Sequence, residues 1–77
     1  DEEAHAVAIH LLENLEGAFS RSLRRARRDG EIQTRENLRD LARYLVGVHQ
    51  ALNVLARAGA GERELRGIVR IALSVLR

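Results

Sequence analysis

The three histidines of this chain are the side chains with the widest chemical range, because imidazole binds metal ions and transfers protons near neutral pH. They are His5, His10 and His49. Within one helix, His5 and His10 would point about 140° away from each other, which does not suit ligands of a single ion. No HExxH or comparable spacing accompanies them. The pattern favours hydrogen-bonded structural histidines, leaves contact with a small effector as an alternative, and predicts no metal and no cofactor.

Nucleophilic catalysis would require a hydroxyl group beside a matched base. The candidate hydroxyl groups belong to Ser20, Ser22, Thr34 and Ser74. No histidine with an acidic partner lies at a spacing from them that is typical of a catalytic triad. Cysteine is absent, and there is no glycine-rich phosphate loop. We therefore predict that the protein is not an enzyme.

A cluster of arginines has the charge needed to bind phosphate groups. It comprises Arg21, Arg24, Arg25, Arg27 and Arg28. No aromatic residues are interleaved with them, and the segment matches no nucleic-acid-binding motif. Cations are also favoured at the carboxyl end of a helix by its macrodipole. We interpret the cluster as a solvated helix end rather than as a nucleic-acid interface.

The two aromatic residues, Phe19 and Tyr44, are candidates for a small-molecule site together with His49. Effector pockets are mostly apolar and carry a few polar groups, which this set would supply. The alternative is that both rings pack in the core, with the tyrosine hydroxyl reaching solvent. The sequence favours core packing and keeps Phe19, Tyr44 and His49 as the candidate effector pocket.

The size and composition of the chain indicate one small domain that needs help to be stable. It has 77 residues, no cysteine, no lysine and a formal net charge of +2. A domain of this size buries only about 60% of its unfolded surface, and without disulfides the most available source of extra stability is oligomerisation. No apolar run approaches the roughly 18 residues of a membrane span, so we expect a cytoplasmic protein with no membrane partner. The chain contains no Met and begins with Asp1, so we expect a trimmed part of a longer protein.

Helix-forming residues dominate, and breaks that contain glycine divide the chain into three predicted helices. The helices are expected at about 2–28, 35–58 and 62–76, which makes the fold all-α. Gly30 is expected to end the first helix in the left-handed conformation. Thr34 is expected to cap the start of the second.

The second predicted helix is apolar on two faces, whereas the first has only one apolar face. One stripe repeats at heptad spacing and consists of Leu38, Leu41, Leu45, Val48, Leu52 and Leu55. The other consists of Tyr44, Gly47, Ala51, Val54 and Ala58. The third helix is also apolar over a wide arc, which includes Leu65, Ile68, Val69, Ala72, Val75 and Leu76.

Two adjacent helices with more apolar surface than a three-helix monomer would use predict an isologous homodimer. In it the last two helices of each copy would form a four-helix bundle. We expect the stripe from Tyr44 to Ala58 and the apolar arc of the third helix to be the dimer interface, because small residues permit close helix approach.

Three segments resemble the carboxyl-terminal, ligand-sensing and dimerisation domain of TetR-family transcriptional regulators. Residues 18–32 (AFSRSLRRARRDGEI) resemble a segment that closes a long helix in that family. Residues 41–46 (LARYLV) resemble the opening of its next helix, and residues 50–60 (QALNVLARAGA) its end. The pattern of Leu65, Ile68, Val69, Ala72, Leu73 and Leu76 follows in the same register. The family often has glycine at the position of Ala51 and an Asp-Pro pair within the stretch 35–37.

The resemblance implies a dimeric four-helix bundle that belongs to a ligand-responsive, DNA-binding bacterial repressor. It also implies that DNA is bound by an amino-terminal helix-turn-helix domain outside this chain, and that other helices complete a pocket for a small-molecule effector. A free-standing helical self-association or adaptor module without DNA binding is the alternative. A helix-turn-helix pattern directly upstream would separate the two.

Overall fold

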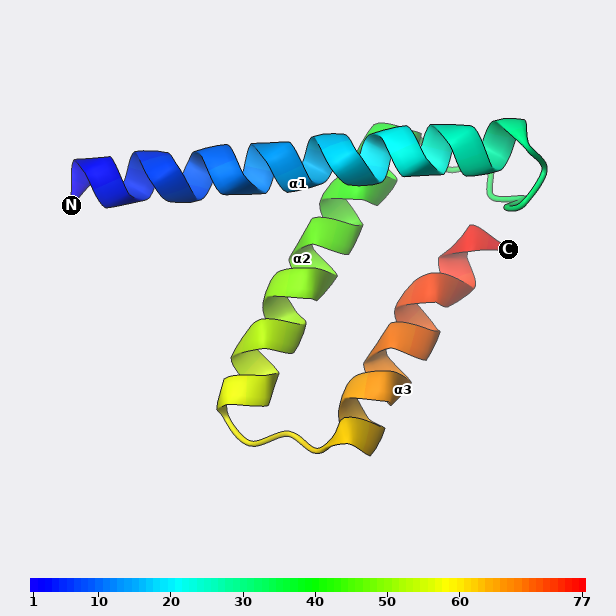
Figure 1. The fold of residues 1–77 in the computed structure, drawn as a ribbon. Coiled ribbons are helices and arrows are strands. Elements are labelled where there is room, and N and C mark those ends of the chain that lie inside the picture. Colours follow the sequence, from blue (N-terminus) through cyan, green and yellow to red (C-terminus); the bar gives the residue numbers. More distant parts are fainter.

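The structure is a computed structural model that describes residues 1–77, and it contains helices and no strands (Figure 1). Helix α1 spans Glu2–Arg28, α2 spans Leu38–Arg57 and α3 spans Glu62–Leu73. A short 3-10 helix, η1, continues α3 over Ser74–Leu76. The prediction of an all-α chain with three helices is confirmed. No helix combines the length and the apolar character that crossing a membrane requires.

Two glycines end α1 and α2 in the same way. Gly30 has φ +76° and Gly59 has φ +97°, so both adopt the left-handed conformation, as predicted for Gly30. The amide of Gly30 donates to the carbonyl of Arg27, and the amide of Glu31 donates to that of Ala26. This pair of bonds is the Schellman motif, which satisfies the last carbonyls of a helix. The equivalent two bonds follow α2 at Gly59.

Replacing Gly30 with alanine is expected to lower the free energy of unfolding by about 1–2 kcal/mol, because a Cβ atom disfavours positive φ. No atom would clash with that Cβ atom, so the loss isolates the backbone effect. Urea denaturation measures it. The matched control is Gly67→Ala within α3, where open space and a helical backbone predict a gain of about 0.5–1 kcal/mol. A loss of equal size in both variants would contradict the assignment.

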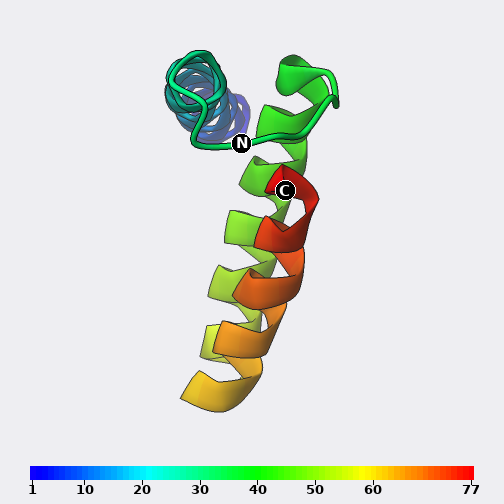
Figure 2. The same ribbon diagram turned by 90° about the vertical axis from the view of Figure 1, so that its right-hand side faces the viewer.

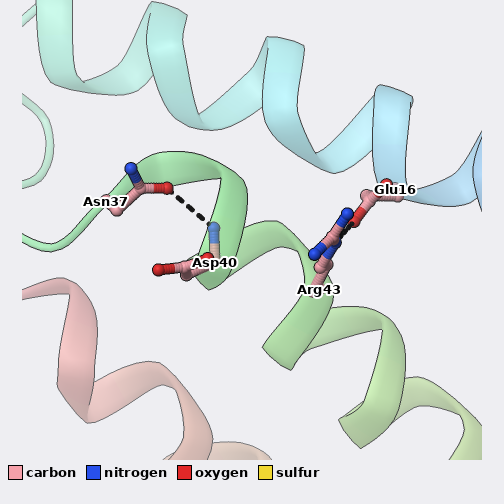
Figure 3. A network of polar contacts seen from close by, with 4 residues as sticks. All are labelled: Glu16, Asn37, Asp40 and Arg43. Atoms are coloured by element: carbon pink, nitrogen blue, oxygen red, sulfur yellow. Dashed lines mark hydrogen bonds and ion pairs between the residues drawn. The ribbon is translucent and has the colours of Figure 1, made fainter.

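The start of α2 differs from the prediction, because Asn37 caps the helix and Thr34 does not. The Asn37 side chain accepts a hydrogen bond from the amide of Asp40 at 3.0 Å, and α2 begins at Leu38 rather than near residue 35 (Figure 3). Thr34 is buried in the connector, where its hydroxyl accepts a bond from the amide of Glu36. Its own amide donates to the carbonyl of Leu76. Thr34 thus links the connector to the carboxyl end of the chain.

The core of the chain lies where α1 crosses the amino-terminal part of α2. Its buried members are Leu23, Leu41, Ala42 and Leu45, and Phe19, Ile32, Leu38 and Leu76 pack around them while half-buried. Helices α2 and α3 run antiparallel beside each other, and α1 makes no close backbone contact with α3 (Figure 1). Only five apolar residues of the chain are buried, so this core is small.

The three helices form a thin assembly with backbone dimensions of 42 × 32 × 14 Å. Figure 2 shows α1 beside one end of the α2–α3 pair, so most of the pair is not covered by α1. The first half of α1 projects beyond α2, and every side chain in residues 1–14 is exposed (Figure 1). Large apolar surfaces therefore lie open on α1 and on the α2–α3 pair.

Candidate self-association surface

The two apolar stripes of α2 point in different directions in the structure. In the heptad stripe, Leu41 and Leu45 are buried in the core, and Leu38, Val48 and Leu52 are half-buried. In the other stripe every residue is exposed: Tyr44 to 43% and Val54 to 61%, with Gly47, Ala51 and Ala58 also open. Leu55, the last residue of the heptad stripe, is 37% exposed. The rest of that stripe packs within the single chain, whereas the second stripe has no partner within it.

The apolar arc of α3 is divided in a similar way. Ala72 is buried, and Leu76 packs against the core cluster, so these two predicted interface residues are covered within the chain. Leu65 and Ile68 are half-buried. Val69 and Val75 are more open, and Ile71, at 60%, is the most exposed large apolar residue of the helix. The interface predicted on α3 is therefore open only in part.

One side of the α2–α3 pair lies opposite α1 and combines residues from both helices. Helix α1 contacts α2 on the side of Leu38, Ala42 and Leu45, and Tyr44 and Ala51 project from the opposite side. Tyr44 and Val75 line one shallow hollow of about 570 Å³ on this side. Ile68 and Ile71 precede Val75 by seven and four residues, so they share its face of the helix. We call this side the open apolar face and define it by Tyr44, Gly47, Ala51, Val54, Ile68, Ile71 and Val75.

A salt bridge joins α1 to α2 beside the apolar core. The Arg43 Nε atom lies 2.6 Å from a Glu16 carboxylate oxygen (Figure 3). Glu16 belongs to α1 and Arg43 to the second turn of α2, so the pair joins the helices just beyond the apolar core. The sequence pattern did not reveal this pair, since the two residues are far apart along the chain.

Arg27 differs from the prediction that the whole arginine cluster is a solvated helix end. Its Nη2 atom donates to the carbonyl oxygens of Thr34 at 2.8 Å and of Glu36 at 2.6 Å. Its Nε atom is buried and has no hydrogen-bond partner. Arg27 therefore anchors the connector that leads into α2. The interpretation as a solvated helix end does not hold for this residue.

Substituting Arg27 with methionine is expected to lower the free energy of unfolding by about 1–3 kcal/mol, because two charge-assisted hydrogen bonds to the connector are lost. Methionine keeps much of the apolar stem. The control is Arg25→Met in the same helix turn, since Arg25 makes no such bond. Thermal unfolding of the two variants compares them. Equal midpoints would show that Arg27 does not stabilise the connector.

The residues of the predicted effector pocket lie apart from one another. Phe19 packs against the core, Tyr44 lies on the open apolar face, and His49 is exposed on α2. Among the larger hollows, Tyr44 lines one, and neither Phe19 nor His49 lines any. No group of three histidine, aspartate or glutamate side chains is arranged to hold a metal ion.

Comparison with known proteins adds no relative to these observations. No family model, no curated protein and no solved structure matches this chain at a significant level.

Proposed function

We propose that this chain is the dimerisation and effector-sensing part of a TetR-like, DNA-binding transcriptional regulator of bacterial origin, most simply a ligand-responsive repressor. In this proposal α2 and α3 of two copies pair about a two-fold axis and form a four-helix bundle. The dimer holds two DNA-binding domains, located outside this chain, at a defined spacing.

The open apolar face is the observation that carries the proposal. The stripe of α2 that the core does not use is exposed along its whole length, from Tyr44 to Ala58. Burying apolar surface contributes about 25 cal/mol per Å², so covering this face would add to the stability of a chain that buries only five apolar residues. Contiguous exposed apolar patches of this kind mark association sites.

The residues at the centre of the face suit helix pairing. Gly47 and Ala51 are one turn apart on α2, and nothing lies within 4 Å of a Cβ atom placed on Gly47. Small residues at that spacing let a second helix approach closely, and Tyr44 and Val54 on either side supply the bulk that closes the seam. An isologous interface uses the same face twice, so one chain supplies everything that the bundle needs.

The regulator part of the proposal rests on the resemblance of three segments, which fall in order on the end of α1 and on α2, and of the pattern that follows them on α3 and η1. An effector that shifts the DNA-binding halves must bind two arrangements of the dimer with different affinities. The α1–α2 crossing, held by Glu16 and Arg43, is where a change in helix angle would reach the bundle.

Sedimentation velocity at low micromolar concentration tests the dimer, and the coding sequence directly upstream tests the regulator. A two-fold mass together with a helix-turn-helix pattern supports both parts. A dimer without that pattern leaves a free-standing self-association module. A folded monomer overturns the central claim, since the open apolar face would then remain in water.

A further inference from the structure

A polar groove of about 820 Å³ runs between the second half of α1 and the connector that leads into α2. It contains none of the residues that define the open apolar face, and it receives no residue from α3. Its lining consists of Glu13, Glu16, Gly17, Ser20, Arg21, Arg24, Arg27, Arg35, Glu36, Asn37, Leu38 and Arg39. Only Leu38 is apolar, so the groove does not suit an apolar ligand.

Positive charge dominates the groove. Five arginines face three glutamates, which leaves a formal excess of two positive charges. Glu16 is already paired with Arg43, which lies outside the lining, so its charge is compensated. Arg21, Arg24, Arg35 and Arg39 form no ion pair with any carboxylate of the chain. Four guanidinium groups are thus free to meet an anion.

The free arginines lie on the two opposite sides of the groove. Arg21 and Arg24 belong to α1, whereas Arg35 lies in the connector and Arg39 in the first turn of α2. A ligand in the groove would contact guanidinium groups from both sides. Planar guanidinium groups bind phosphate oxygens in a bidentate manner, and four of them match a ligand with more than one phosphate.

Hydrogen bonds hold the connector side of the groove in place. Arg27 binds the carbonyls of Thr34 and Glu36, on either side of Arg35, and so fixes the connector against α1. On the α1 side of the groove, the Arg21 Nη1 atom lies 3.3 Å from the position that a Cβ atom of Gly17 would occupy. The glycine therefore leaves room for the Arg21 side chain to lie across α1. The bonds of Arg27 thus hold the backbone on either side of Arg35 in place.

We propose that this groove binds an anion with at least two linked phosphate groups, held between the α1 arginines and those of the connector and α2. The site goes beyond the dimerisation role and does not rest on it. The phosphates can come from a small polyphosphate-bearing molecule or from a nucleic-acid backbone, since the guanidinium groups recognise chemistry common to both.

Isothermal titration calorimetry of the full chain with tripolyphosphate at low ionic strength tests the proposal. The variant Arg24→Gln/Arg39→Gln removes one charge from each side of the groove. It is expected to weaken tripolyphosphate binding at least about tenfold, because charge-assisted contacts are lost. The control Arg63→Gln/Arg70→Gln removes the same charge from α3 and should change the affinity less than about twofold. Circular dichroism verifies that both variants are folded. Absence of binding, or equal losses in the two variants, overturns the proposal.

A second arm of the titration distinguishes the sources of phosphate. If a short DNA duplex binds more tightly than tripolyphosphate and the groove variant loses it, the phosphates belong to a nucleic-acid backbone. If tripolyphosphate binds and the duplex does not, they belong to a small molecule. A variant that disrupts the dimer should keep its affinity for tripolyphosphate, so failure of the homodimer proposal would leave this result unaffected.

Discussion

Val54→Asp is expected to convert the protein into a monomer at concentrations where the unchanged chain is dimeric. Val54 is 61% exposed in the single chain, so an aspartate there meets water and leaves the fold intact. In the proposed bundle the same carboxylate would be buried against its own copy across the two-fold axis. An unpaired buried charge costs several kcal/mol, which exceeds what a small interface can offset. Sedimentation velocity with circular dichroism measures association and fold together.

Val7→Asp is the matched control, because the substitution is identical and Val7 is 56% exposed on the projecting half of α1. This variant should remain a dimer. Two monomeric variants would show that association is not specific to the open apolar face. A dimeric Val54→Asp variant would place the interface elsewhere.

Leu41→Ala is expected to lower the free energy of unfolding by about 2–5 kcal/mol, the cost of leaving a cavity in a packed core. Leu41 is one of four buried residues in the cluster that joins α1 to α2, and little else can close over the gap. A domain of this size has a total stability of about 4–12 kcal/mol, so a substantial part of it would be lost. Urea denaturation at several protein concentrations separates this effect from that of dimerisation.

Leu11→Ala provides the comparison for the core substitution, since Leu11 is 64% exposed and contributes to no core cluster. Its effect should stay within about 0.5 kcal/mol, as for most surface substitutions. Equal destabilisation by both variants would mean that the projecting half of α1 is buried in solution and that the core extends beyond the crossing.

The helices themselves were predictable because their signals are local. Glycine in the left-handed conformation at residue 30, carboxylates at the start of α1 and periodic leucines all act within a few residues. The cap of α2 was not predictable in this way, since Thr34 and Asn37 are both good caps. In the structure the amide of Thr34 donates to the carbonyl of Leu76, a contact that depends on how the whole chain folds.

The groove and the contacts of Arg27 could not be predicted from the sequence either, because they also depend on how the whole chain folds. A cluster such as Arg24, Arg27 and Arg28 looks uniform in a helix, yet only Arg27 forms hydrogen bonds with the connector. Arg35 and Arg39 join the groove because the connector folds back along α1, and no spacing rule describes that path. The two faces of α2, in contrast, were visible in the periodicity of its residues, although their partners were not.

The projecting half of α1 has a consequence for how order is distributed along the chain. Helix formation is costly to nucleate and cheap to extend, and the packed turns around Phe19 and Leu23 already supply the nucleus. The turns before residue 9 then add one by one, since they line none of the larger hollows that α1 shares with α2, and the bond from the Ala4 amide to Asp1 closes their end. Their amides should lose protection from hydrogen exchange in a gradient toward the amino terminus, while the crossing opens as a single cooperative unit.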